Sequence, residues 1–268
     1  NFGSFISSLA TPLLLKFYGP SIAFGIPGGL MMVATLLFWM GRNEFVHIKP
    51  FGKGFINVLF SKEGLAVISK LAVVYLFIAF FWSLYDQTSS TWITQSKSVF
   101  MDKSIDIFGF SITLLPSQIG SINPIMILIL VPIFTFLIYP HLKRFTPLRK
   151  ITVGMIIASL SFVIIGFAEA KISQGITVSI YYQFLAYFII TIAEILISVT
   201  ALEFSYSQAP NEMKSFIMSL YLLSISVGNF FIIIVNKTIT NEVKIERIEA
   251  FADQTLVSVS DTKDYVLS

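Results

Sequence analysis

The stretch VSIYYQFLAYFIITIAEILISVTALEF, residues Val178 to Phe204, decides the fold class because it is long, apolar and almost free of charge. About 20 residues that rise about 1.5 Å each match a hydrocarbon core of about 30 Å, so this segment can cross a bilayer as a helix. Its charged residues are Glu203, at the far end, and Glu194, which would lie near the membrane midplane.

Glu194 is the residue of this segment that needs an explanation. An ionised carboxylate at the midplane costs on the order of several kcal/mol unless it is paired, protonated or hydrated. A chain that keeps such a group there is predicted to handle a cation or a proton. The alternative is a hydrogen bond between helices that has no part in transport.

The composition supports a membrane protein and excludes several other classes. Of the 268 residues 55% are hydrophobic and only 12% are charged, whereas a soluble domain carries about 25% charged residues. The absence of cysteine excludes disulfides and thiolate metal sites, and two histidines make a histidine zinc site unexpected. The net charge of +3 comes from loops, so it does not indicate nucleic-acid binding. No phosphate loop or nucleophile–base pattern is present, so we predict neither an enzyme nor a cofactor.

Six further apolar segments occur along the chain, which gives an all-α membrane protein as the predicted fold class. They are Asn1–Leu15, Ser21–Gly41, Ala66–Trp92, Leu114–Tyr139, Ile151–Ala168 and Phe216–Val235. The first is too short to span a bilayer unaided, and the stretch 236–268 has no apolar run. Because the chain opens inside an apolar segment, we interpret it as a fragment that lacks material at its N-terminal end alone or at both ends.

The distribution of Lys and Arg predicts the orientation of these segments. Basic residues are concentrated in loop 42–65, in loop 143–150 and at Lys214, whereas the alternate loops hold only Lys16, Lys97, Lys103 and Lys171. The richer side is predicted to face the cytoplasm. A seven-helix receptor with an external N-terminus would place loop 42–65 outside, so the charges argue against that class.

Asp86 is a second carboxylate within an apolar segment, in the sequence FFWSLYDQTSSTW (residues 80–92). It lies near the predicted outer end of its helix and is followed by several hydroxyl side chains. A carboxylate there can pair with a base on another helix and hold an outer gate shut, until protonation releases the partner. The alternative is an interfacial aspartate that meets water.

Proline and glycine interrupt two of the segments. The second contains Gly25, Pro27 and Gly28, and the fourth contains Asn123-Pro124 and Pro132. Proline bends a helix and leaves carbonyl groups that need other partners. Bent helices around a midplane site are typical of secondary transporters, although they also occur in inert bundles.

Several motifs, in order, resemble the proton-dependent oligopeptide transporters of the major facilitator superfamily. The matching stretches are Asn1–Ser4, Ala23–Gly28, Phe81–Gln87, Ser121–Pro124 and Glu194–Ser215. The resemblance implies part of a twelve-helix bundle, covering about helices five to eleven. Residues 1–41 would close the N-terminal bundle, 42–65 form the cytoplasmic interdomain loop, 66–235 provide helices seven to eleven, and 236–268 lead outside to helix twelve.

The resemblance also implies a substrate site. Glu194 corresponds to the glutamate that receives the peptide ammonium, while Asn123 and Asn1 correspond to asparagines that hydrogen-bond the peptide. Trp82 would line the pocket, and Asp86 would couple protonation to opening of the external gate, paired with a first-helix arginine that this sequence lacks.

Two further residues belong to the implied pocket. Tyr221 stands where the family usually has tryptophan, which leaves the selectivity for side chains open, and Ser224 is a candidate hydroxyl for substrate.

The function implied is a symporter that imports di- and tripeptides with protons by alternating access. It would lie in the plasma (inner) membrane and need the missing N-terminal helices, without metal, cofactor or nucleic acid. The alternatives are transport of another solute on the same scaffold, such as nitrate or a drug-like anion, and an inactive truncated remnant.

Overall fold

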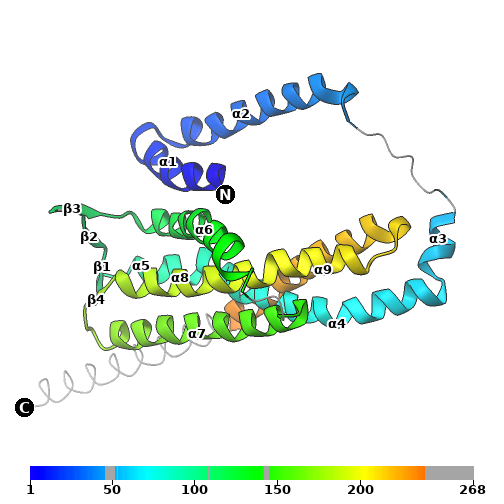
Figure 1. Ribbon diagram of the computed structural model, residues 1–268. Helices are drawn as coiled ribbons and strands as arrows, with labels where there is room; N and C mark the ends of the chain where they lie inside the picture. Colours follow the sequence, from blue (N-terminus) through cyan, green and yellow to red (C-terminus); the bar gives the residue numbers. More distant parts are fainter. Residues whose placement is uncertain (46–51, 53, 108, 142–144, 239–268) are drawn as a thin grey trace, which may run out of the picture.

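The computed structural model describes residues 1–45, 52, 54–107, 109–141 and 145–238, and these residues form a helical membrane protein (Figure 1). Six helical stretches are long and apolar enough to span a membrane: Pro20–Asn43, Lys62–Ser96, Pro116–Ile138, Pro147–Ser173, Tyr181–Gln208 and Asn211–Thr238. They match six of the seven predicted segments. The remaining segment forms α1 (Phe2–Tyr18), which has only 17 residues.

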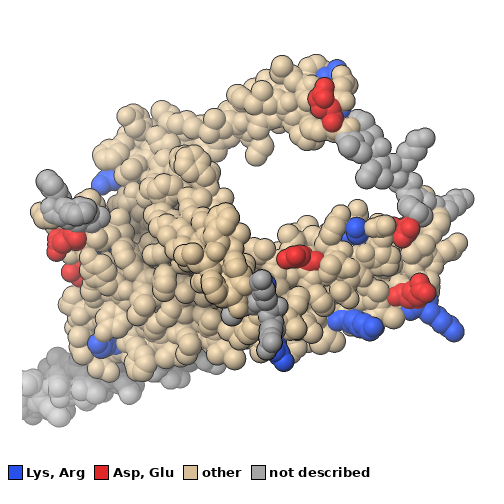
Figure 2. All heavy atoms as spheres, in the orientation of Figure 1, with Lys and Arg blue, Asp and Glu red and all other residues tan. Residues whose placement is uncertain are grey.

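The chain begins with a hairpin of α1 and α2 (Pro20–Met40), which η1 (Gly41–Asn43) follows. Gly19 joins the two helices with φ of 79°, a conformation that glycine adopts without a steric penalty, and Pro20 opens α2. α1 packs against the rest of the molecule, whereas Ala23 is the one buried residue of α2. Figure 2 shows open space between α2 and the bundle below it.

The next span is a broken helix. After α3 (Gly54–Leu59), α4 (Lys62–Tyr85) starts at Ser61, whose hydroxyl accepts a hydrogen bond from the Gly64 amide at 3.0 Å. α4 leads into the short 3₁₀ segment η2 (Asp86–Ser89), and α5 (Thr91–Ser96) completes the span. The predicted single segment Ala66–Trp92 is therefore interrupted directly after Tyr85.

Two small sheets lie at one end of the bundle, and the sequence analysis did not predict them. β1 (Met101–Asp102) pairs in parallel with β4 (Val178–Ser179), and β2 (Ser104–Ile107) pairs antiparallel with β3 (Phe110–Thr113). The predicted helix start at Val178 is consequently three residues early. The Val178 amide donates to the Phe100 carbonyl at 2.8 Å, so it is already paired outside a helix.

Two spans in the second half of the chain each contain a π-helical turn. η3 (Pro116–Ser121), α6 (Ile122–Ile133) and the π-helix η4 (Phe134–Ile138) form the first. After α7 (Pro147–Ser173), the second combines α8 (Tyr181–Glu194), the π-helix η5 (Ile195–Val199) and α9 (Thr200–Gln208). After η6 (Asn211–Met213), the last described helix covers residues 214–238.

Close packing at glycines holds these helices together. A Cβ atom at Gly154 of α7 would lie 2.5 Å from Ile197 Cγ1, and one at Gly228 would lie 2.4 Å from the Ala79 carbonyl oxygen. Small residues let helix backbones approach closely in a membrane, where lipid is as apolar as the side chains. The two π-helical turns meet in one apolar cluster formed by Leu130, Phe134, Ile195 and Leu196.

The loops fall at two opposite ends of the bundle. The sheets and the turn between α7 and β4 lie at one end, and α3 and the end of α9 lie at the other (Figure 1). Most charged side chains visible in Figure 2 also lie toward these ends, beside a broad uncharged surface. The polar stretch predicted to form an external loop lies almost wholly outside the described residues.

Candidate functional site

The centre of the site is a hydrogen bond between two helices. Glu194 is the last residue of α8, and Asn123 is the second residue of α6. Asn123 Nδ2 donates to Glu194 Oε2 at 2.8 Å. Asn123 is 8% exposed and Glu194 is half-buried. Two polar residues predicted from separate motifs are therefore in direct contact.

Two neighbours complete this network. Tyr85 Oη donates to Asn123 Oδ1 at 3.0 Å, and Asn123 Nδ2 also donates to Thr191 Oγ1 at 3.0 Å. The Tyr85 hydroxyl lies beside the Glu194 carboxylate as well. Within the described part of the chain, no lysine or arginine contacts Glu194. Its carboxyl group is instead held by two uncharged groups, the Asn123 amide and the Tyr85 hydroxyl.

Aromatic side chains form one wall beside Glu194. The Trp82 and Tyr85 rings meet edge to face with centroids 5.2 Å apart, and Tyr221 contacts both Trp82 and Tyr75. The Trp82 indole nitrogen is buried and has no hydrogen-bond partner among the described residues. The predicted aromatic residues Trp82 and Tyr221 therefore lie together.

Asp86 is the first residue of η2, directly after the break that follows Tyr85. Asn229 of the last described helix lies beside its carboxyl group, and the adjacent Gln87 Nε2 donates to Asn236 Oδ1 at 3.0 Å. These contacts connect the broken span to the last described helix. Asp86 therefore lies at a joint between helices.

The structure does not bring Asn1 and Ser224 into the network. Asn1 is exposed at the start of α1, where its side chain makes no capping hydrogen bond. Ser224 is buried, but its hydroxyl donates to the Tyr221 carbonyl at 2.6 Å within its own helix. Neither side chain contacts Glu194 or Asn123 in this arrangement.

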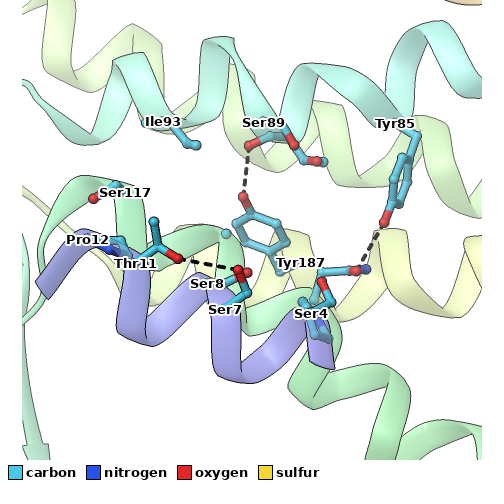
Figure 3. Close-up of a pocket in the computed structure, with 14 residues that line it drawn as sticks. Ser4, Ser7, Ser8, Thr11, Pro12, Tyr85, Ser89, Ile93, Ser117 and Tyr187 are labelled. Atoms are coloured by element: carbon cyan, nitrogen blue, oxygen red, sulfur yellow. Dashed lines mark hydrogen bonds between the residues drawn. The ribbon is translucent and has the colours of Figure 1, made fainter. Parts of the chain in front are cut away.

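A cavity of about 410 Å³ lies between α1 and the other helices, next to Asn123 (Figure 3). Its lining is polar but uncharged. The residues are Ser4, Ser7, Ser8, Thr11, Pro12, Tyr85, Thr88, Ser89, Ile93, Ser117, Gly120, Asn123, Pro124 and Tyr187. Hydroxyl groups from α1 thus line the same cavity as hydroxyl groups from η2 and η3.

The sequence analysis missed most of this cavity. The four hydroxyl residues of α1, namely Ser4, Ser7, Ser8 and Thr11, have the i, i+3, i+4, i+7 spacing that puts them on one helix face. That periodicity could have predicted the hydroxyl-lined side of the cavity from the sequence. Tyr85 and Tyr187 had no such signal, because an isolated tyrosine in an apolar segment is compatible with a core or a lipid-facing position. Among the described residues, no group of His, Asp and Glu could hold a metal ion.

Comparison with known proteins gives one consistent family. The model of the POT family matches residues 1–72 and 60–252. Peptide transporter 3 of Caenorhabditis elegans is 30% identical over 218 residues, which are 65% of this chain and 30% of that protein. Solute carrier family 15 member 2 of Homo sapiens is 29% identical over 220 residues, 65% of this chain and 29% of that protein. The chain thus spans less than a third of these relatives.

Solved structures agree. The crystal structure of the POT family transporter PepTSo superposes with a TM-score of 0.71 at 31% identity, and the match covers 89% of this chain and 61% of that one. An auto-inhibited POT family peptide transporter gives a TM-score of 0.75 at 26% identity, covering 94% of this chain and 62% of that one. The long apolar helices, the order of the motifs and these matches lead to one conclusion: the chain is part of a multi-pass integral membrane protein and belongs to the POT family.

Proposed function

We propose that the full-length protein is a symporter that imports di- and tripeptides with protons across the plasma membrane, by alternating access. The observation that carries this proposal is Glu194, a carboxylate within a membrane span that only uncharged groups of the described chain contact. A peptide zwitterion needs an anionic pole for its ammonium group. In this proposal Glu194 is that pole, and the cationic pole comes from helices outside this sequence.

The surroundings of Glu194 suit a variable substrate. Asn123 would hydrogen-bond the peptide backbone, and Trp82 and Tyr221 would pack against its side chains. Broad apolar-aromatic walls with few polar anchors accept different side chains. Asn1 and Ser224 would join the site only if helices move during the transport cycle, because both lie apart from Asn123 in this structure.

A proton gradient is sufficient to drive such uptake. Ten-fold accumulation requires about 1.4 kcal/mol, and one charge that crosses 100 mV releases about 2.3 kcal/mol. Asp86 is the proposed coupling residue, because protonation of a carboxyl at a joint between helices changes which arrangement is favoured. Only a difference in binding between two states can shift their populations.

The alternative solutes fit the site less well. Nitrate or a drug-like anion would use only the cationic pole of the site and would leave the Glu194 carboxylate without a partner, because no lysine or arginine within the described part of the chain contacts Glu194. A peptide ammonium group, in contrast, matches the charge of Glu194.

Uptake of a labelled dipeptide into proteoliposomes that contain the full-length protein tests the proposal. We expect accumulation with an inward proton gradient, little without it, and inhibition by unlabelled di- and tripeptides but not by nitrate. Inhibition by nitrate instead would indicate an anion transporter. Absence of any uptake by folded, correctly inserted protein would favour an inactive remnant.

A further inference from the structure

The hydrogen bonds around Asn123 can be assigned by donor and acceptor type alone. The Glu194 carboxylate can only accept when ionised, and the Thr191 hydroxyl uses its own hydrogen on the Tyr187 carbonyl at 2.7 Å. Both groups therefore need the amide NH₂ of Asn123, which contacts them at 2.8 Å and 3.0 Å. The amide oxygen must then face the opposite way.

The amide oxygen of Asn123 has one partner, the Tyr85 hydroxyl at 3.0 Å. Asn123 is buried, so an amide oxygen without a donor would lose its hydration with no replacement. With the Tyr85 hydroxyl in place, only one orientation of the amide satisfies all partners. Without it, the amide oxygen would have no donor in its present position, so rotation of the Asn123 side chain away from Glu194 and into the cavity would become favourable.

We infer that Tyr85 is a positioning residue: its hydroxyl fixes the Asn123 amide so that the NH₂ group holds one oxygen of Glu194 and aims the carboxylate at the substrate ammonium. The inference rests on the proposed function of Glu194. It concerns a residue at the end of α4, directly before the break at η2, so the same hydroxyl ties the end of α4 to α6 and α8.

The groups that face this network are few. Tyr187 comes from α8, Tyr221 from the last described helix, and Asp86 follows Tyr85 in the chain. None of these three contributes a positive charge. Tyr85 also lines the cavity together with Asn123, so polar molecules in the cavity meet the network at these two side chains.

The test is Tyr85→Phe in the full-length protein, measured as proton-driven dipeptide uptake. We expect KM to rise about ten-fold while the maximal rate changes less than two-fold, because the ring and its packing stay and the substitution removes only the hydroxyl, which holds Asn123 and lies beside Glu194. The matched control is Tyr182→Phe near the start of α8, which removes a hydroxyl that accepts from Lys171 Nζ at 3.1 Å, outside the network and the cavity. That variant should keep the wild-type KM.

A double-mutant cycle with Asn123→Ala separates positioning from direct binding. If Tyr85 acts through Asn123, Tyr85→Phe should raise KM clearly less in the Asn123→Ala background than in the wild type. Equal effects in both backgrounds would overturn the inference, as would a wild-type KM for Tyr85→Phe alone. Failure of the proposed function looks different, because the wild-type protein itself would then show no dipeptide uptake.

Discussion

Asp86 is the residue whose position between helices bears on the proposed proton coupling. It lies at the break between α4 and α5, half-buried, with Asn229 beside it and the Gln87–Asn236 hydrogen bond next to it. A proton bound there would weaken the contact between the broken span and the last described helix. This position between helices is the basis of the coupling role that we propose for Asp86.

We accordingly expect Asp86→Asn to lose gradient-driven accumulation while it keeps exchange of labelled for unlabelled dipeptide at equal pH. The neutral amide resembles the protonated carboxyl but cannot release a proton. Asp106→Asn, on the exposed strand β2, is the control and should behave as wild type in both assays. Loss of exchange as well as accumulation would place Asp86 in substrate binding and contradict the coupling role.

Individual site residues were predictable to different degrees. Glu194 and Asp86 were found because a carboxylate in an apolar segment is costly, and Asn123 and Trp82 because their motifs resemble the family. The hydroxyl face of α1 was also readable from its spacing. The role of Tyr85 could not be predicted from the sequence. It depends on the hydrogen-bond donor that the Asn123 amide oxygen needs, and Asn123 lies in a different helix 38 residues away.

At the scale of helices, packing at glycine decides which surfaces can meet. Gly154 of α7 faces η5 so closely that an added Cβ atom would lie 2.5 Å from Ile197 Cγ1 and 3.2 Å from the Ala193 carbonyl oxygen. Gly166, on the same helix, has nothing within 4 Å of the corresponding position. The two glycines therefore allow the same substitution to be compared at a tightly packed and at an open position of one helix.

We expect Gly154→Ala to destabilise the protein by about 1–3 kcal/mol, since overpacking forces neighbouring atoms to move. Gly166→Ala should leave stability unchanged or slightly raise it, because alanine favours a helix. Thermal unfolding of both variants in the same detergent measures the difference. Equal transition temperatures would show that α7 and η5 do not pack this closely.

The helix boundaries illustrate what sequence patterns miss. Apolar length predicted the six long spans, whereas the break after Tyr85 contains no proline and was not predicted. The π-helical turns at Phe134–Ile138 and Ile195–Val199 were not predicted, because they depend on how α6 and α8 pack against each other. Such turns are frequent at functional sites, and one of them follows Glu194 directly.

For the whole molecule, the property that matters for transport is which end of the bundle faces the cytoplasm. Successive loops lie at alternate ends of the bundle. The distribution of Lys and Arg predicts that one of these ends, where α3 and the last turn of α9 lie, faces the cytoplasm. Alternating access requires a substrate site between these ends. The Glu194–Asn123 pair lies within two of the spans, as that requirement demands.

Cysteine labelling of intact cells tests this orientation, because the chain itself contains no cysteine. Val99, between α5 and β1, is 88% exposed, and Glu212 lies exposed at the other end. With cysteines outside this chain replaced, Val99→Cys should react with an impermeant maleimide from outside, whereas Glu212→Cys should react only after permeabilisation. The reverse pattern would invert the predicted topology.

The central claim is that the Glu194 carboxylate binds the substrate ammonium group, and one substitution tests it directly. Glu194→Gln keeps the size of the side chain and its ability to accept from Asn123, but removes the charge. Proton-driven uptake of a labelled dipeptide should be abolished in this variant, whereas Glu203→Gln, an exposed position in the same span, should retain it. Accumulation by Glu194→Gln at the wild-type level would contradict the account.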